Sequence, residues 1–298
     1  MHRFTLIFIF FIQTIYAQPP RLMLPIGHND VIKDFAFSKN GKFIVTGSED
    51  RTVKVWEVNT GRLLQNFTNF NAKVQSVDFN PNNKTVIACS DDGFFYEWDI
   101  YTGKIITALK NENEMMSKCV FNPAGNIVAL AYNYHYSDTC EIVLFDIVKK
   151  KIIKRIAAHK EKIHQLIFHP NGNAILSSSY DRWMKLWDVQ SGKLINKTDA
   201  TTKDSLYIYS MQFSKNGDKI LVCNSNRKLF FYETNTFKVI KNYANDSINC
   251  SYAKFSNNEK YIVVGGSSGK FFMLDAKTLQ VIKNFQTNDM NEKFSATD

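Results

Sequence analysis

Apolar segments of about six residues alternate with short polar turns along most of the chain. Near the N-terminal end the turn "SKNGK" precedes the apolar segment "FIVTGS", and a second short turn then leads to "VKVWEV". The same order returns further on, as in "HPNGN" followed by "AILSSS" and "WMKLWDV". Short apolar runs bounded by Gly, Asn, Pro and Asp are typical of β-strands joined by tight turns. Each unit is therefore predicted to contain four short strands.

The units repeat with a measurable period. One aromatic or apolar position recurs at Trp56, Trp98, Phe145, Trp187, Tyr232 and Leu274, in steps of 42, 47, 42, 45 and 42 residues. A second position lies 19 residues upstream in five units, at Phe37, Phe79, Phe168, Phe213 and Phe255. In the third unit Phe121 lies 24 residues before Phe145, which indicates a five-residue insertion around "NYHYSD". A period near 42 with four strands predicts an all-β propeller.

At these residues the chain resembles the WD-repeat (beta-transducin-type) β-propeller family. The pair Gly27-His28, the stretch "FSKNGKFIVTGSEDRTVKVWEV" at 37–58 and "KLWDV" at 185–189 carry the resemblance, which runs from about Pro20 to Asp298. It implies a propeller domain over residues 18–298. Six four-stranded blades are recognisable, at approximately 27–67, 69–109, 111–156, 158–197, 203–242 and 245–285.

A strand left over at the N-terminal side bears on how the ring closes. "RLMLP" at 21–25 resembles an outer strand that WD-repeat rings donate to their last blade, but the sixth unit already has its own outer strand at 279–285. We therefore expect a seven-bladed ring in which residues 286–298 begin an incomplete further blade. Irregular closure with six blades is the alternative. Unpaired blade edges would favour self-association.

The resemblance also implies a buried hydrogen-bonded chain in two units. It joins a His before the first strand, a Ser or Thr of the second strand, a turn Asp and the third-strand Trp. The first unit supplies His28, Thr46 or Ser48, Asp50 and Trp56, and the fourth supplies His159, Ser177 or Ser179, Asp181 and Trp187, with Ser48 and Ser179 assigned as the hydroxyls. Such carboxylates are structural, because a buried charge requires donors. The remaining units depart from this pattern and are expected to depend on aromatic packing.

The N-terminal residues have the composition of a secretory signal peptide. His2 and Arg3 precede an apolar run from Phe4 to Ile12, and "IYA" ends at Ala17, after which cleavage is expected. An uncleaved anchor is the alternative, but the run is about half as long as a bilayer requires. The sequence therefore predicts an exported protein, secreted or periplasmic. It shows no further segment apolar enough to span a membrane.

Candidate chemistry is sparse. Cys89, Cys119, Cys140, Cys223 and Cys250 form no CxxC pair or disulfide framework, and we expect them to be buried small hydrophobes. The cluster His159, Glu161, His164 and His169 lacks the HExxH spacing of a zinc helix. A net charge of +9 is scattered over turns without a nucleic-acid motif. We expect no cofactor, no metal, no specific nucleic acid and no catalysis.

Surface loops then become the candidate functional site. The loops between blades and between the second and third strands line one rim, whose residues by alignment are Asp30, Glu49, Asp91, Tyr134, Tyr136, Lys162, Tyr180, Arg182 and Tyr207. Aromatics flanked by charges are typical of interface anchors, although these tyrosines could simply cap loops. The leading hypothesis is a non-catalytic exported scaffold that binds proteins. The alternative is the N-terminal sensory or docking region of a longer exported protein whose missing C-terminal part carries an activity such as a caspase-like peptidase.

Overall fold

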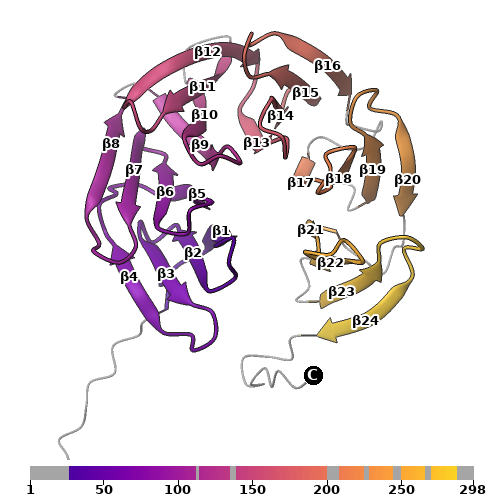
Figure 1. The fold of residues 1–298 in the computed structure, drawn as a ribbon, viewed down its shortest axis with the longest axis horizontal. Coiled ribbons are helices and arrows are strands. Elements are labelled where there is room, and N and C mark those ends of the chain that lie inside the picture. The colour runs from indigo at the N-terminus through magenta and orange to yellow at the C-terminus, as the bar shows by residue number, and fades with distance from the viewer. Residues whose placement is uncertain are drawn as a thin grey trace, which may run out of the picture.

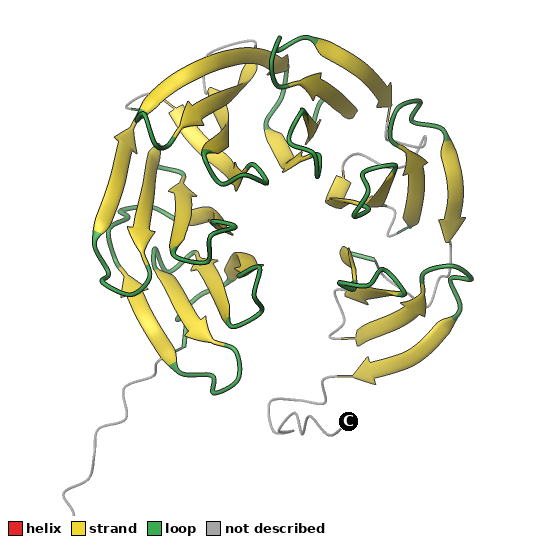
Figure 2. Ribbon diagram, in the orientation of Figure 1, coloured by secondary structure: helices red, strands yellow, loops and turns green. Residues whose placement is uncertain are grey.

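The chain folds as a ring of β-sheets. The computed structural model describes residues 27–111, 114–134, 139–199, 208–224, 228–243, 250–265 and 270–286. Within these ranges 24 strands form six four-stranded antiparallel sheets, and no helix occurs. The sheets stand side by side around a central axis (Figures 1 and 2). The predicted all-β propeller of four-stranded blades is confirmed. The signal peptide at 1–17, the leftover strand at 21–25 and residues 287–298 lie outside the described ranges.

Each blade runs from an innermost to an outermost strand in chain order. Blade 1 comprises β1 (Ile32–Phe37), β2 (Phe43–Ser48), β3 (Val53–Glu57) and β4 (Leu63–Phe67); blade 2 comprises β5 (Val74–Phe79), β6 (Thr85–Ser90), β7 (Phe94–Asp99) and β8 (Ile105–Lys110); blade 3 comprises β9 (Glu114–Phe121), β10 (Ile127–Tyr134), β11 (Cys140–Asp146) and β12 (Lys151–His159).

The second half of the chain repeats this arrangement. Blade 4 comprises β13 (Ile163–Phe168), β14 (Ala174–Ser179), β15 (Trp183–Asp188) and β16 (Leu194–Asp199); blade 5 comprises β17 (Ile208–Phe213), β18 (Lys219–Asn224), β19 (Leu229–Glu233) and β20 (Val239–Tyr243); blade 6 comprises β21 (Tyr252–Phe255), β22 (Tyr261–Gly265), β23 (Lys270–Asp275) and β24 (Val281–Gln286). Gln286 therefore ends a blade 6 strand instead of beginning a further blade.

The register of the strands explains the constant spacing of the two sequence landmarks. In blade 1, Phe37 of β1 and Trp56 of β3 both pair with Ile44 of β2. In blade 3, Phe121 and Phe145 likewise both pair with Val128, although the insertion separates them by five more residues. The extra residues are accommodated in the longer β10 and in the connection to β11, which includes the undescribed residues 135–138. The landmarks thus share one line across each blade.

Apolar packing between neighbouring blades forms the core. The second strands β6 and β14 are buried along their full length, because each of their faces meets an adjacent blade. Five buried clusters join blades 1 and 2, 2 and 3, 3 and 4, 4 and 5, and 5 and 6. Each blade is therefore stabilised mainly by the neighbours on its two sides.

Blades 1 and 6 meet less closely than the other neighbours (Figure 1), and none of the five clusters of described residues joins them. Phe37 is 56% exposed, whereas its counterpart Phe79 is 5% exposed. Phe271 is 40% exposed, whereas its counterpart Phe95 is fully buried. A ring contact between Phe35 and a blade 6 tyrosine, with centroids 5.6 Å apart, crosses this seam. Core-type positions at the seam are thus left facing solvent, and the seven-bladed ring remains a prediction.

The cysteines divide into two groups. Cys89, Cys119 and Cys140 are free and buried, as expected of small hydrophobes. Cys223 of β18 and Cys250, which precedes β21, instead form a disulfide. Both are buried, as expected, but the sequence did not indicate their pairing, because no local spacing shows that residues 27 positions apart in neighbouring blades meet.

The seam leads to a first prediction. Phe79→Ala should cost about 3–5 kcal/mol of unfolding free energy, because it removes a buried ring. Phe37→Ala, at the equivalent position, should cost about 1 kcal/mol or less, because that ring is largely in water. Denaturant unfolding of both variants measures the difference. Equal losses would show that Phe37 is covered in solution.

Candidate functional site

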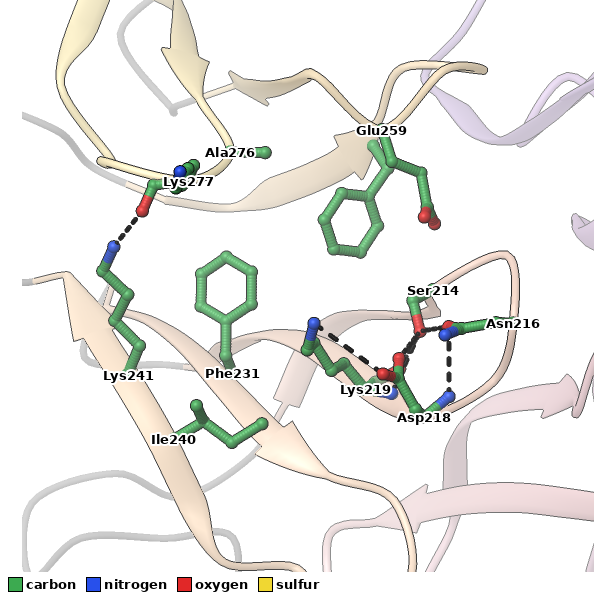
Figure 3. A pocket seen from close by; sticks show the side chains of 11 residues that line it. Ser214, Asn216, Asp218, Lys219, Phe231, Ile240, Lys241, Glu259, Ala276 and Lys277 are labelled. Atoms are coloured by element: carbon green, nitrogen blue, oxygen red, sulfur yellow. Dashed lines mark hydrogen bonds and ion pairs between the residues drawn. The ribbon is translucent and has the colours of Figure 1, made fainter.

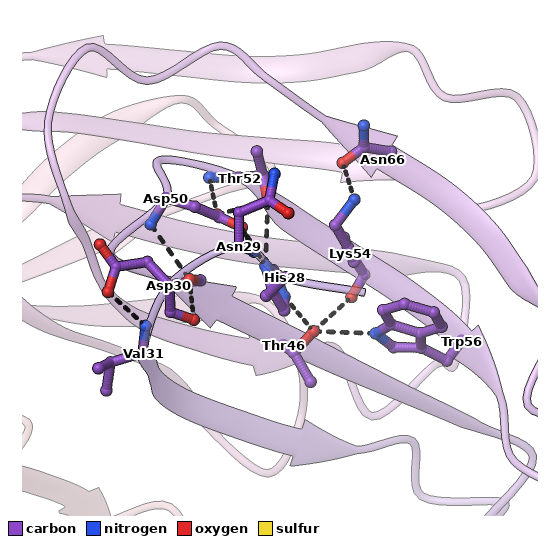
Figure 4. A network of polar contacts seen from close by, with 11 residues as sticks. His28, Asn29, Asp30, Val31, Thr46, Asp50, Thr52, Lys54, Trp56 and Asn66 are labelled. Carbon is purple, nitrogen blue, oxygen red and sulfur yellow. Dashed lines mark hydrogen bonds and ion pairs between the residues drawn. The ribbon is translucent and has the colours of Figure 1, made fainter. Parts of the chain in front are cut away.

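Blade 1 contains a chain of four polar side chains (Figure 4). His28 Nδ1 lies 2.9 Å from Asp50 Oδ2, and His28 Nε2 lies 2.7 Å from Thr46 Oγ1. The indole N–H of Trp56 donates to the same Thr46 oxygen at 2.9 Å. The chain links the segment before β1 with the second and third strands and with the turn between them. It therefore fixes the segment before β1 to the rest of blade 1.

Blade 4 repeats this chain with a serine. His159 Nδ1 lies 2.9 Å from the nearer oxygen of Asp181, His159 Nε2 lies 2.7 Å from Ser177 Oγ, and Trp187 donates to that hydroxyl at 2.9 Å. Burial lowers the pKa of His159 despite the opposing effect of Asp181, so the ring is neutral at pH 7. A neutral ring that donates from Nδ1 to a carboxylate accepts at Nε2. The Ser177 hydroxyl therefore donates to His159.

The hydroxyls assigned from the sequence, Ser48 and Ser179, do not take part in these chains. Trp56 pairs with Ile44, so Thr46 lies on the same face two residues along, while Ser48 is four residues away and out of reach of the indole. Ser48 donates instead to the Asp30 carbonyl at 3.1 Å. Ser179 likewise donates to the Glu161 carbonyl at 2.7 Å. These serines fix the preceding loop, and the assignment within the chains is corrected to Thr46 and Ser177.

The two turn aspartates are saturated acceptors. Asp50 accepts backbone N–H bonds from Asn29 and Thr52, both at 2.9 Å, and Asp181 accepts from Lys160 at 3.1 Å and Trp183 at 3.0 Å. Burial raises the pKa of each carboxyl, but these hydrogen bonds and the histidines outweigh it and lower both to about 2. Both are ionised at pH 7 and hold their acceptor sites filled. Such groups stabilise loops and cannot donate a proton to a substrate.

Blade 2 uses ring packing where the histidine is replaced. Phe70 stands at the histidine position and meets Trp98 edge-on, with ring centroids 5.9 Å apart. Phe67 stacks on the same indole at 4.6 Å. The Trp98 N–H donates to the Asn69 side chain at 3.2 Å instead of to a strand hydroxyl. Aromatic contacts thus take over part of the fastening role in this blade.

The predicted rim residues fall into separate groups. Glu49 forms ion pairs with Lys73 and with Lys33, the latter at 3.4 Å. Asp91 accepts from Gln75 at 2.6 Å, Asp30 from the Val31 N–H at 2.7 Å, and Glu141 from the Tyr134 hydroxyl at 2.7 Å. Tyr180 is exposed and packs on His164 with ring centroids 5.4 Å apart. Lys162 lines a cavity at the centre of the ring, which Tyr180 and His164 also line. Arg182 is exposed. Tyr136 and Tyr207 lie outside the described ranges.

The central channel contains a polar site that the sequence analysis missed. It is a cavity of about 480 Å³ lined by innermost strands of all six blades. Asp34 of β1 receives the Lys118 ammonium of β9 at 2.9 Å and the Ser76 hydroxyl of β5 at 2.7 Å. The available signal was the presence of charged residues one or three positions before the landmark Phe, at Asp34, Asp78, Lys118 and Lys254.

A second cavity, of about 380 Å³, lies between blades 5 and 6 (Figure 3). Phe231, Phe255 and Ile240 contribute its apolar wall, and charged residues including Asp218 and Lys219 lie at its edge. Between blades 4 and 5 a corresponding cavity, of about 420 Å³, is lined by His169, whose Nε2 lies 3.1 Å from the Gly217 carbonyl. Blade 5 carries Ser214 at the position of His169.

Comparison with known proteins supports the repeat assignment. A family profile described as "WD domain, G-beta repeat" matches residues 21–57, 61–99 and 150–188. These three segments end near Trp56, Trp98 and Trp187, the landmark positions that hold tryptophan. The matches are consistent with a WD-repeat β-propeller.

Similar proteins share parts of the chain. The chain is 24% identical over 214 residues to the "Periodic tryptophan protein 2 homolog" of Dictyostelium discoideum, covering 71% of this chain and 22% of that protein. It is 26% identical over 106 residues to human "Pre-mRNA-processing factor 17", covering 35% of this chain and 18% of that protein. It is 46% identical over 39 residues to the "Ribosome biogenesis protein BOP1 homolog" of Aedes aegypti, covering 13% and 4%. The chain therefore spans less than a quarter of these relatives.

The prediction of an exported protein is contradicted by these relatives. Two of them are named for ribosome biogenesis and pre-mRNA processing, which take place inside cells and not in a periplasm or secreted fluid. The apolar N-terminal run that suggested export lies outside the described ranges. In the part of the chain that the structure describes, no helix could cross a membrane, and no three His, Cys, Asp or Glu side chains gather as a metal site.

The blade 4 chain leads to a second prediction. Asp181→Asn should lower the unfolding free energy by about 2–4 kcal/mol, because it breaks a buried charge-assisted network. Asp188→Asn is the matched control, since Asp188 is half-buried and its side chain bonds within its own turn, to Ser191 at 2.6 Å. Thermal and denaturant melts measure both. Equal losses of unfolding free energy in the two variants would contradict the structural role assigned to Asp181.

A third prediction concerns pH. Burial, together with Lys118, Lys162 and Lys33, lowers the pKa of His164 to about 4, against about 6.5 in an unfolded chain. The unfolded chain therefore binds more protons between these values, and this contribution to stability is lost as the pH falls from 6.5 towards 4. Comparing unfolding at pH 7.5 and pH 5, His164→Gln should lose about 1–2 kcal/mol less than the unsubstituted chain. Identical pH profiles would contradict the assignment.

Proposed function

We propose that this chain is a WD-repeat propeller that acts as a non-catalytic scaffold for other proteins, through the rim formed by its inter-blade loops and its second-to-third-strand turns. The fold and the three repeat matches support the general role, because relatives with the same repeats are named for multi-component processes. No catalytic role is proposed for the turn aspartates, since their acceptor sites are filled.

The observation that carries the proposal is a set of hydrogen bonds between neighbouring segments of the rim. In blades 1 and 4 the aspartate of the second-to-third-strand turn accepts an N–H bond from the segment before the first strand, at Asn29 and at Lys160. Two loops of the same rim are thereby fixed to each other before any partner arrives. Preorganised loops lose less conformational entropy on binding, which favours affinity.

Charged and aromatic groups stand on this fixed rim. Glu49 lies between two lysines from neighbouring blades, and Tyr180 and Arg182 project from the blade 4 turn. Tyrosine and arginine are the residue types most often found at the energetic centre of protein interfaces. We propose the blade 4 turn as the main contact.

A fourth prediction tests the rim. Tyr180→Ala combined with Arg182→Ala should weaken partner binding by at least about tenfold, the loss expected for interface anchors. Tyr101→Ala is the matched control, because this exposed tyrosine lies on a third-to-fourth-strand turn at the other rim. Quantitative co-purification from the native cells would identify proteins retained by the control and lost by the double variant. Equal retention by both would refute the proposed rim.

A further inference from the structure

The central channel has more positive than negative groups. The residues that line it include four lysines, Lys33, Lys118, Lys162 and Lys254, and two aspartates, Asp34 and Asp78. Asp78 is half-buried, and burial raises the pKa of this carboxyl to about 7, so it carries only part of a charge at neutral pH. The channel thus holds an excess of cations inside a low-dielectric wall, where electrostatic attraction is strengthened.

Two of these lysines lack a carboxylate of their own. Lys118 is paired with Asp34 at 2.9 Å, and Lys33 with Glu49 at 3.4 Å. Lys254 of β21 has no hydrogen bond or ion pair to any described residue, and its recorded contact is with the Tyr252 ring, 5.9 Å from the ammonium. Lys162 likewise has no ion pair within the described ranges. Burial lowers the pKa of Lys254, and Asp34 and Asp78, which act on its ammonium without forming an ion pair, oppose this only in part.

Position within the repeat explains why Lys254 is left over. The residue before the landmark Phe is Asp78 in blade 2 and Gln212 in blade 5, and each accepts the landmark N–H of the next blade, at Phe121 and Phe255, both at 2.8 Å. Blade 6 has Lys254 at this position, and a lysine cannot accept a hydrogen bond. Blades 1, 3 and 4 have the apolar Ala36, Val120 and Ile167 there, so Lys254 is the one cation at this position, and it forms no such link to a neighbouring blade.

The lysines of the channel also affect His164. This ring lies on β13 in the wall of the channel, and Lys118, Lys162 and Lys33 all act to lower its pKa in addition to burial. Burial lowers the pKa of Lys254, Asp34 and Asp78 raise it, and Lys118 adds a smaller lowering effect. The two ammoniums are therefore close enough to repel each other.

We propose that the central channel binds a small multivalent oxyanion, a phosphate- or carboxylate-bearing molecule, through Lys254 with support from Lys118 and Lys162. The anion accepts from the Lys254 ammonium and relieves its repulsion with Lys118. A cavity of about 480 Å³ is within the range of small-molecule sites. This site is separate from the rim proposed for protein partners, although Lys162 and Tyr180 lie where the two meet.

The test uses the full chain with inorganic phosphate and, in a parallel arm, citrate, at ionic strength matched with chloride. Titration calorimetry should show saturable binding of at least one of the two anions. Lys254→Met, which removes the charge and keeps most of the chain length, should weaken this binding by at least about tenfold. Lys260→Met is the matched control, because Lys260 is exposed on the first turn of the same blade and does not line the channel.

A second readout distinguishes a bound anion from general screening. A bound anion stabilises the imidazolium form, so it should raise the pKa of His164 by about one unit in a nuclear magnetic resonance titration. Lys254→Met should abolish this rise, and Lys260→Met should leave it unchanged. If Lys254→Met does not fold, Lys162→Met provides the same comparison. The proposal fails if neither anion binds saturably, if Lys254→Met and Lys260→Met weaken binding equally, or if the pKa of His164 does not respond.

Discussion

The alignment of one residue from each of the first three strands is the constraint on which the ring depends. Phe37, Ile44 and Trp56 stand in one line across blade 1, and the same line recurs at Phe79, Val86 and Trp98 in blade 2. Because every blade carries this line at the same depth, the faces of adjacent blades present matching apolar rows. The five buried clusters follow from that match. A blade displaced by one residue would turn its apolar rows away from both neighbours.

Only some blades add a hydrogen-bonded chain of side chains to this packing. Blades 1 and 4 carry the His–hydroxyl–Trp chain with its aspartate, whereas blade 2 stacks aromatic rings on Trp98. The polar chain satisfies each of its buried groups, and the ring packing avoids burying them. Both solutions fix the third-strand Trp. In all three blades the turn aspartate also accepts an N–H from the segment before the first strand, at Asn29, Asn71 and Lys160.

The blade 1–6 seam and the channel differ in chemistry because they result from different repeat positions. At the seam, the landmark Phe37 and the third-strand Phe271 remain apolar but are largely exposed. In the channel, the position before the landmark Phe changes from an acceptor in blades 2 and 5 to Lys254 in blade 6. Blade 6 thus combines an uncovered apolar face with an unpaired cation. No other blade in the described ranges has both features.

The sequence by itself determined the blade. The spacing of Trp56, Trp98 and Trp187 and the turns between the strands predicted four short strands per unit, because local pattern and turn chemistry dictate short antiparallel strands. It also identified His159, Asp181 and Trp187 as one group. Which hydroxyl completes the group was decided by register, a property of two strands together, and so Ser177 replaced Ser179.

Only the tertiary structure decided the contacts between blades. The Cys223–Cys250 disulfide, the meeting of Asp34 with Lys118 across two blade boundaries, and the exposure of Phe37 all join or separate residues far apart in the chain. No local pattern encodes such distances, because they depend on the angle at which each sheet packs on the next. The channel charges were visible as residue types, but their convergence required the closed arrangement of six innermost strands around one axis.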